Sequence, residues 1–549
     1  MIEEQKQAAK HTPYALPVLV IVSAVVFLFG LGWLALIGPD EPRYAEVARE
    51  MFATGDYIST RLCGCLWFEK PALLYWMSAA SYHLFGVNEF AARFPSAVAA
   101  LATVLFVYFT LRRVATERAA FAAALVLATS GIFIGYARVA TTDMPLTASM
   151  SVSLLSGYLA INARGRTRFG WWALSFGAMG LAMLAKGLVG FLLVIAALAL
   201  YDLIARHREV ISWKELFVGL GIFSIVAATW YVPVTLRHGW PFIEEFFIRH
   251  HFQRYTSNVF GHPQPFYFFF FVAIAGVIPW SFFLIPAAWR IKELKPRAVK
   301  EDSLISLAWV WIVVPVVFFS LSESKLPGYI LPVFPALAII VGFEIERLLS
   351  SDRSRLSISA AWLTALFLIA AGVGLIVYSN REGVSASGWR NTLLYIPLVF
   401  AFASLAMLAL KKARAFVTGA ALVVLSLVVA AVIILFPMLS YRESLKPLSL
   451  EATAALRPGE RIAFFIRKEF APVFYAEGRV VCAPGEGGVF NALTKDALAD
   501  ELRGESSLIV ITSSNWVADL ESDGRFNLEF IGEQGSALAF RIKLNETAM

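Results

Sequence analysis

The protein has 549 residues, of which 58% are hydrophobic and only 16% are charged, and its mean hydropathy is +0.68. Soluble domains contain about 25% charged residues, so this composition excludes an ordinary soluble protein and indicates an integral membrane protein. The formal net charge is +7. Because the basic residues gather in short loops between apolar segments, they serve as topological markers, and we expect no nucleic-acid partner.

About thirteen apolar segments are long enough to cross a bilayer, because roughly 20 apolar residues in a helix span its hydrocarbon core. The fold class predicted from them is an α-helical polytopic membrane protein. The first segment lacks a small-residue cleavage site, so it predicts a permanent helix. The predicted spans are 14–36, 91–111, 119–136, 144–163, 171–187, 188–205, 215–236, 266–289, 303–321, 328–347, 357–378, 392–410 and 415–437.

The loops between these spans alternate in charge. Each loop that follows an even-numbered span carries at least three basic residues, and the positive-inside rule places such loops in the cytoplasm. The odd-numbered loops then face outward, and the loops 38–90 and 237–265 are long and mixed in charge. The loops marked as cytoplasmic begin with Arg112, Arg164, Arg206, Arg290, Arg347 and Lys411.

The first outer loop opens with GPDEPRYAEVAREM, residues 38–51. Asp40 precedes Glu41 and Pro42, an arrangement typical of a helix N-cap. An amphipathic helix is expected to follow, with an apolar face at Tyr44, Val47, Ala48 and Met51. Asp40 is therefore a helix cap or a functional acid, and the charges of Arg43, Glu46, Arg49 and Glu50 on the opposite face favour the functional role.

A second acid, Asp143, occurs in ARVATTDMP at the outer start of the fourth span. It is also a cap or a functional group. Ionisable residues at membrane boundaries are commonly functional unless they reach the headgroup region, and aspartate is too short to reach far. The pair Asp40 and Asp143 is therefore more specific than either acid alone.

Two further stretches supply cations. WFEKP, residues 67–71, contains Glu69 and Lys70, which form either an ordinary surface ion pair or part of a site in which lysine binds phosphate. SESKLPGYILP, residues 322–332, places Lys325 and Tyr329 at the outer start of the tenth span.

Histidines concentrate in the second long outer loop, where RHHFQRY covers residues 249–255. His250, His251 and His262 lie near Arg254, and His250 with Glu69 from the first loop could bind a divalent metal such as Zn, Mn or Mg. Without a fixed ligand spacing this signal is weak. No cofactor is predicted with certainty.

The composition changes after Tyr441. Short strand patterns at 461–466, 479–483, 507–512, 528–532 and 537–542, with helical segments among them, predict a small outer α/β domain over residues 441–549, preceded by a transmembrane domain over residues 1–440. GEGG at 485–488 is expected to form a turn, because no Lys-Ser/Thr follows it. Cys63 and Cys65 could close a small ring, but we expect both to be unpaired.

The stretches DEPRYAEVAREM, FATGDYISTRL, WFEKPALLYW, FGVNEFAARFPS, TTD and SKLPGYILPVFPALA occur in this order along the chain. Together they resemble the bacterial 4-amino-4-deoxy-L-arabinose lipid A transferases. That family belongs to the C-type glycosyltransferase superfamily, as do the protein O-mannosyltransferases. The resemblance covers the whole chain, including thirteen spans and an outer C-terminal domain.

The resemblance implies transfer of 4-amino-4-deoxy-L-arabinose from undecaprenyl phosphate to a phosphate of lipid A, at the periplasmic face of the inner membrane, with resistance to polymyxin as the result. It implies catalytic roles for Asp40 and Asp143. The substrate-binding residues expected from it and from the loop chemistry are Arg43, Glu69, Lys70, Arg254, Lys325 and Tyr329.

Two alternatives stay open. One is another polyprenyl-phosphate-sugar transferase, for example one that glycosylates protein serine or threonine. The other is a lipid-linked-sugar transporter, which usually carries its polar residues within the spans at mid-membrane. Here the charged residues gather at one end of the spans, which favours the enzyme.

Overall fold

The computed structural model describes residues 14–205, 211–253, 263–295, 300–350, 353–381, 389–466, 470–481 and 493–545. The chain divides into two compact units, each described here by itself. Unit 1 comprises Met1–Leu31, Glu69–Leu73 and Phe94–Ile434, and unit 2 comprises Gly32–Phe68, Leu74–Arg93 and Leu435–Met549. The first outer loop therefore groups mainly with the C-terminal segment. That residues 441–549 alone form a separate soluble domain stays a prediction.

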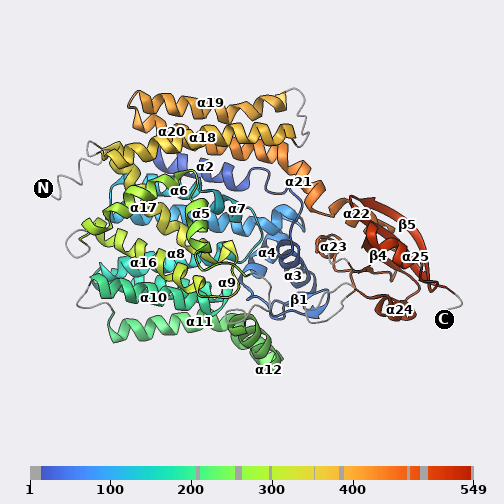
Figure 1. The fold of residues 1–549 in the computed structure, drawn as a ribbon. Helices are drawn as coiled ribbons and strands as arrows, with labels where there is room; N and C mark the ends of the chain where they lie inside the picture. The colour runs from blue at the N-terminus through green and yellow to red at the C-terminus, as the bar shows by residue number, and fades with distance from the viewer. Residues whose placement is uncertain are drawn as a thin grey trace. The chain divides into compact units, whose positions relative to one another are not determined.

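Unit 1 is almost entirely helical, and its long helices run roughly along one common direction (Figure 1). One further helix, α5 (Glu89–Val114), begins in unit 2 and continues into unit 1. The other elements are α2 (Ala15–Leu28), α6 (Glu117–Ala128), α7 (Gly131–Ala137), α8 (Asp143–Ile161), α9 (Gly165–Lys186), α10 (Leu188–Ala205), α11 (Trp213–His238), α12 (Trp240–Ile243), η1 (Glu244–Gln253), α14 (Phe268–Gly276), η2 (Trp280–Phe283), α15 (Leu284–Trp289), η3 (Arg290–Glu293), α16 (Lys300–Ser320), η4 (Pro327–Val333), α17 (Phe334–Leu349), α18 (Arg355–Arg381), α19 (Trp389–Ala409), α20 (Ala413–Ala430) and η5 (Ala431–Leu435).

Within the described part of the chain, nine helices are long and apolar enough to cross a membrane, and two bent pairs raise the number to 11. The pairs are α6 with α7, bent by 63°, and Phe268–Gly276 with Trp280–Glu293, bent by 110°. The remaining two predicted spans coincide with α2, which has 14 residues, and α9, which has 22. The predicted class, a polytopic helical membrane protein, is confirmed.

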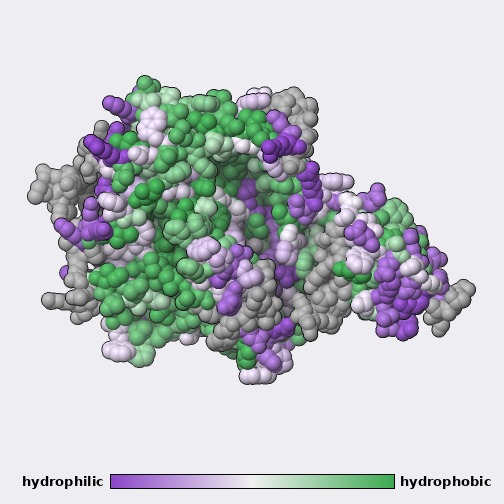
Figure 2. Space-filling model, in the orientation of Figure 1, coloured by the Kyte–Doolittle hydropathy of each residue, from purple (hydrophilic) through white to green (hydrophobic). Residues whose placement is uncertain are grey.

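Burial separates the inner helices of unit 1 from the outer ones. In the apolar windows of α8 and α17, 89% and 94% of the residues are buried, whereas the corresponding share in α11 is 22%. The side chains exposed on α11 are large and apolar, and the face of unit 1 in Figure 2 is mostly hydrophobic. Such a surface suits contact with lipid. Helix α8, which begins at Asp143, therefore lies in the interior of the unit.

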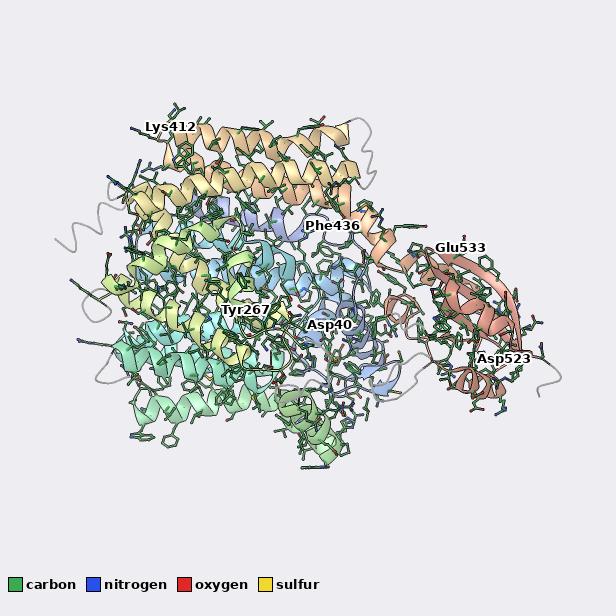
Figure 3. All side chains as sticks on the ribbon, in the orientation of Figure 1. Asp40, Tyr267, Lys412, Phe436, Asp523 and Glu533 are labelled. Carbon is green, nitrogen blue, oxygen red and sulfur yellow. The ribbon has the colours of Figure 1, made fainter. Side chains whose placement is uncertain are left out.

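The helix ends predicted to be cytoplasmic meet one another. Glu344 near the end of α17 contacts Arg347 at 2.6 Å and Arg290 at 3.7 Å, and it accepts a hydrogen bond from Ser357 of α18. The hydroxyl of Thr116, between α5 and α6, donates to Glu346. Three of the basic loops thus lie on one side of unit 1. A further basic loop, between α19 and α20, contains Lys412 (Figure 3).

Unit 2 combines segments from both ends of the chain. From the N-terminal part come α3 (Asp40–Thr54), α4 (Leu73–Phe85, of which Leu73 belongs to unit 1) and the two-stranded hairpin β1 (Arg61–Leu62) and β2 (Cys65–Leu66). The C-terminal part adds α21 (Phe436–Glu443), α22 (Lys446–Ala455), β3 (Ile462–Phe464), α23 (Ala471–Tyr475), α24 (Lys495–Gly504), β4 (Leu508–Ser513), η6 (Ser514–Trp516), α25 (Val517–Glu521), β5 (Phe526–Gln534) and β6 (Ala537–Leu544).

The four C-terminal strands form one sheet in the order β3-β4-β6-β5. Strand β3 pairs with β4 in parallel, whereas β4 with β6 and β5 with β6 are antiparallel. Asp523 lies just before β5 and Glu533 near its other end (Figure 3). Four of the predicted strand segments are confirmed. The fifth, 479–483, contributes only a bridge from Val480 to Ile462 among its described residues.

The cysteine prediction is wrong for Cys65, which is disulfide-bonded, whereas Cys63 is free. In the hairpin, Cys65 pairs with Leu62 as part of a strand, while Cys63 lies in the turn with φ 53°. A ring between the two cysteines therefore does not form. Cys482 and the GEGG stretch lie outside the described residues.

A buried ion pair fixes the entry of the chain into α3. The guanidinium of Arg93 donates to both carboxylate oxygens of Glu41 at 2.7 Å and also to the carbonyl oxygens of Leu34 and Ala35. Both charged side chains are 1% exposed. This network was not predicted from the sequence.

Replacing Arg93 with methionine should lower the free energy of unfolding by about 3–5 kcal/mol, because the Glu41 carboxylate would stay buried without its partner. Denaturant unfolding of the purified protein measures this change. The control is Arg503→Met, which removes an exposed pair with Asp500 and should cost less than about 1 kcal/mol. Equal stability of the two variants would contradict the structural role of Arg93.

Candidate functional site

The first group of candidate site residues in unit 1 lies where α8 begins and α9 ends. Asp143 is the first residue of α8, and its carboxylate pairs with the ammonium group of Lys186, the last residue of α9. The same ammonium nitrogen lies 4.9 Å from the centre of the Tyr329 ring. Three elements that are separate in sequence, α8, α9 and η4, thus contribute one acid, one cation and one aromatic ring.

Both charged groups of this cluster are partly shielded. The side chain of Asp143 is 13% exposed and that of Lys186 is 15% exposed. Asp143 is the acidic residue in the first turn of α8, and the N-cap residue Thr142 makes no side-chain capping hydrogen bond. A shielded ion pair interacts more strongly than one in water, and the ammonium retains N–H donors for a further acceptor.

A tightly packed loop positions Lys325 and Tyr329. Lys325 is buried, and its ammonium group donates to the carbonyl oxygen of Ser322. Between the two residues, Gly328 lies so close to Tyr136 that an added Cβ would be 2.6 Å from the tyrosine hydroxyl. The glycine therefore permits the close approach of η4 to α7, which fixes the residues on either side of it.

The second group in unit 1 joins the first outer loop to η1. Glu69 and Lys70 form a buried pair with an N–O distance of 2.9 Å, and His250 interacts electrostatically with both. The His250 ring nitrogen Nε2 lies 3.1 Å from Glu245. Burial lowers the pKa of His250, although Glu245 and Glu69 act in the opposite direction, so the ring is held mainly neutral.

Metal binding by Glu69 and His250 was an open possibility in the sequence. Among the residues that the structure describes, no group of three or more His, Cys, Asp or Glu side chains is arranged to hold a metal ion. Glu69 is paired with Lys70, whose ammonium competes with a cation for the carboxylate. The described residues therefore do not fit a three-ligand metal site.

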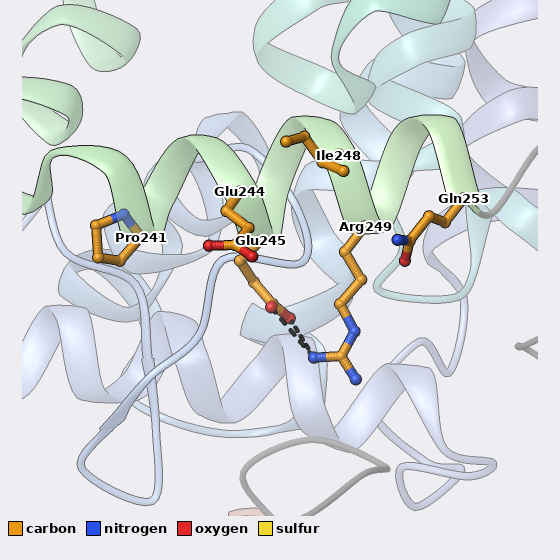
Figure 4. A pocket seen from close by; sticks show the side chains of 6 residues that line it. All are labelled: Pro241, Glu244, Glu245, Ile248, Arg249 and Gln253. Carbon is orange, nitrogen blue, oxygen red and sulfur yellow. Dashed lines mark hydrogen bonds and ion pairs between the residues drawn. The ribbon is translucent and has the colours of Figure 1, made fainter.

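Beside this group, one face of η1 borders a cavity of about 330 Å³ (Figure 4). Glu245 contacts Arg249 at 3.2 Å across the helix surface, and the hydrogen bond to His250 lowers the pKa of Glu245. Arg249 and His250 follow Glu245 by four and five residues along η1, and the Glu245 carboxylate contacts both side chains. The cavity is lined by Pro241, Glu244, Glu245, Ile248, Arg249 and Gln253.

Asp40 belongs to unit 2. It is the first residue of α3, it forms no side-chain cap, and its carboxylate pairs with Arg43. The guanidinium of Arg43 also donates to the carbonyl oxygen of Pro39 at 2.8 Å. The Asp40 side chain is 44% exposed, against 16% for Arg43. Arg43 is therefore held in place and orients the Asp40 carboxylate, which stays accessible to a ligand.

Further along α3, Glu46 is fully buried and forms two hydrogen bonds with Arg49, at 2.7 and 2.8 Å. Burial raises the pKa of Glu46 to about 8, against the lowering influence of Arg49. The charged face that was predicted to support function is thus largely interior. Its residues join α3 to the rest of unit 2.

The structure brings together several residues that the sequence singled out. Asp143 and Tyr329 meet through Lys186, Glu69 and Lys70 meet near His250, and Asp40 meets Arg43. Arg254 and His262 lie outside the described residues, as does the side chain of His251.

Lys186 is a candidate site residue that sequence reasoning missed. It is the only charged residue between Arg168 and Asp202, and it immediately precedes Gly187, where α9 ends. An isolated lysine within so long an apolar stretch is itself a signal of function, because an unpaired charge is costly there.

Comparison with known proteins identifies related chains. A family model described as dolichyl-phosphate-mannose-protein mannosyltransferase matches residues 69–232. The undecaprenyl phosphate-alpha-4-amino-4-deoxy-L-arabinose arabinosyl transferase of Aeromonas salmonicida (strain A449) is 32% identical over 398 residues, which are 71% of each chain. The corresponding protein of Pseudomonas aeruginosa (strain LESB58) is 33% identical over 347 residues, 60% of this chain and 61% of the relative.

A solved structure matches as well. The crystal structure of ArnT from Cupriavidus metallidurans bound to undecaprenyl phosphate aligns with a TM-score of 0.79 and 25% identity, covering 96% of this chain and 97% of that one. The fold and the site thus define a polytopic membrane glycosyltransferase of the C-type class. Within that class, the chain belongs to the undecaprenyl phosphate-alpha-4-amino-4-deoxy-L-arabinose arabinosyl transferase family. The resemblance stated from the sequence motifs, and the enzyme class, are confirmed.

Proposed function

We propose that this protein transfers 4-amino-4-deoxy-L-arabinose from undecaprenyl phosphate to a phosphate group of lipid A at the periplasmic face of the inner membrane. The name of the Aeromonas relative specifies this sugar and this carrier, and the aligned crystal structure contains undecaprenyl phosphate. The observation that carries the proposal is the Asp143–Lys186 pair beside Tyr329, at the end of helices whose unit is apolar on the outside.

In the proposed reaction, a phosphate oxygen of lipid A forms a bond to the anomeric carbon of the sugar. The bond from that carbon to the undecaprenyl phosphate oxygen breaks, and undecaprenyl phosphate leaves with the electron pair. The acceptor is ionised at neutral pH, since the second pKa of a phosphate monoester is about 6. No proton has to be removed for the attack, so no strong general base is needed.

The cations of the site would stabilise the leaving phosphate. Lys70, Lys325 and Lys186 are held by neighbouring groups in unit 1, and a positioned cation stabilises charge that develops in the transition state. Tyr329 would add a hydroxyl donor beside Lys186. The role of Arg254 as a further phosphate ligand stays a prediction from the family resemblance.

The acids would act on the sugar. Asp40 presents an open carboxylate, which could stabilise the positive charge of the oxocarbenium-like transition state and of the 4-amino group. Asp143 would keep Lys186 in place and contribute the second carboxylate. Because both substrates are lipids confined to one leaflet, holding them in the correct orientation supplies a large part of the rate enhancement.

Glu69 and Arg43 have supporting roles in this proposal. Glu69 holds Lys70, and Arg43 holds Asp40, so each orients a residue that meets the substrate. No step is routed through a metal ion. The metal role predicted for Glu69 and His250 stays a prediction that elemental analysis of the purified protein would check.

The proposed product explains a cellular effect. Aminoarabinose adds a positive charge to lipid A and masks a phosphate, which weakens the attraction between the membrane and cationic peptides such as polymyxin. The periplasmic location rests on the charge alternation of the loops, and on the meeting of three basic helix ends on one side of unit 1.

The test is a transfer assay with purified protein, the undecaprenyl-phosphate-linked aminoarabinose and lipid A, read by mass spectrometry. The expected product is lipid A that carries aminoarabinose, and cells that lack the gene should contain none of it. Transfer to a serine- or threonine-containing peptide instead would support a protein glycosyltransferase. Movement of the labelled donor across liposomes without transfer would support a transporter.

A further inference from the structure

The C-terminal part of unit 2 reaches the helix that carries Asp40. Phe470 lies just before α23, and the centre of its ring is 4.9 Å from the guanidinium carbon of Arg43. The ring of Trp67, from the first outer loop, is 5.5 Å from the same atom. Two aromatic rings thus contact the arginine whose guanidinium pairs with Asp40.

Two further contacts attach the same C-terminal segment to α3 and its approach. The hydroxyl of Tyr475 accepts a hydrogen bond from the backbone N–H of Leu36 at 2.9 Å and donates one to Glu89 at 3.0 Å. At Gly478, where φ is +76°, an added Cβ would be 2.7 Å from Arg49 and 2.8 Å from Glu46. The segment 470–478 therefore contacts three places: the chain just before α3, the first turn of α3 and the third turn of α3.

We infer that the C-terminal segment 470–478 positions Asp40, with Phe470 and Trp67 clamping the guanidinium of Arg43. A guanidinium over aromatic faces is held by cation–π attraction and loses fewer orientations when it binds a carboxylate. Asp40 itself is 44% exposed, and Arg43 is the side-chain partner that the structure shows for its carboxylate. Fixing Arg43 therefore restricts the rotamers of Asp40.

The clamp gives the C-terminal part of the protein a role in the reaction. A carboxylate that must meet a developing positive charge is effective only when it is held close to its productive orientation. Phe470 does not touch the substrate in this account and is a positioning residue. The inference rests on the proposed function, in which Asp40 acts on the sugar.

The experiment compares Phe470→Ala and Phe470→Leu with Phe470→Tyr in the transfer assay. The first two variants remove the aromatic face, and turnover should fall about tenfold, which corresponds to about 1.4 kcal/mol. KM for donor and acceptor should stay within about twofold, because substrate contacts are unchanged. Phe470→Tyr keeps the ring and should retain at least half of the wild-type turnover.

The matched control is Phe530→Ala, which changes an exposed phenylalanine of β5, also in unit 2, that packs on Phe540. It should leave turnover unchanged. When Arg43→Met is already present, adding Phe470→Leu should cause no further loss of turnover, because the guanidinium that Phe470 contacts is absent. This non-additivity is a result that general destabilisation would not produce.

Wild-type turnover in Phe470→Leu would overturn the inference, as would equal losses in Phe530→Ala and Phe470→Leu or additive losses in the Arg43→Met background. These outcomes differ from failure of the proposed function. If the wild-type protein transfers no aminoarabinose, the function is wrong. If the wild type is active and Asp40→Asn is inactive while Phe470→Leu is unaffected, only the positioning role is wrong.

Discussion

Lys186→Met is expected to lower the turnover of aminoarabinose transfer by about 100- to 1,000-fold, the loss typical when one preorganised electrostatic group is removed from an active site. The substitution leaves Asp143 shielded without its cation and removes the positive charge beside Tyr329. Methionine has a similar length and no charge, so packing is largely kept. The measurement is the rate of product formation with purified enzyme at saturating donor.

Three comparisons make this test specific. Lys186→Arg keeps the charge but changes its geometry, so activity should be partly retained. Lys412→Met alters an exposed lysine in the loop between α19 and α20, and it should behave as wild type. Adding Asp143→Asn to Lys186→Met should cost much less than Asp143→Asn alone, because the two groups act as a pair. If Lys186→Met had wild-type turnover, Lys186 would have no role in the reaction.

Asp40→Asn is expected to reduce turnover by a similar factor, about 100- to 1,000-fold, because asparagine keeps the shape but not the negative charge that meets the cationic sugar. Asp40 is partly exposed, so the thermal stability of the variant should match that of the wild type. In cells, lipid A should lose aminoarabinose, and survival in polymyxin should fall. Mass spectrometry of lipid A and a survival assay, in one strain, measure both effects.

The control for Asp40 is Asp500→Asn, which changes an exposed acid of α24 and should leave lipid A modification intact. Asp40→Glu retains the charge on a longer side chain and is expected to retain intermediate activity. If Asp40→Asn modified lipid A normally at equal protein levels, the carboxylate would have no part in the chemistry.

The sequence predicted the helices well because their signal is local. Apolar runs of sufficient length locate the spans, and short runs rich in β-branched and apolar residues locate β4, β5 and β6. Asp40 and Asp143 were each placed at a helix start, where the structure has them. What the local signal could not decide was whether each acid capped its helix or paired with another side chain.

The pairs themselves depend on tertiary packing. Asp143 meets Lys186 because α8 packs against α9, and no periodicity in either helix encodes the partner. Arg43 meets Phe470 although the two lie near opposite ends of the chain, and Glu41 meets Arg93 across the first outer loop. The disulfide at Cys65 was missed for the same reason. Such contacts are specified by the fold as a whole rather than by the spacing of residues.

The proposal depends most on the site facing the outer leaflet, where donor and acceptor lipids meet. In a Cys63→Ser background, which removes the free thiol that the structure describes, one cysteine is added either at Val87, in the first outer loop, or at Lys412. Each variant is tested with a membrane-impermeant maleimide in cells whose outer membrane has been permeabilised, against the Cys63→Ser protein as the background. We expect Val87→Cys to be labelled in cells with an intact inner membrane. Lys412→Cys should be labelled only after that membrane is broken. The reverse pattern would place the first outer loop in the cytoplasm and contradict the account.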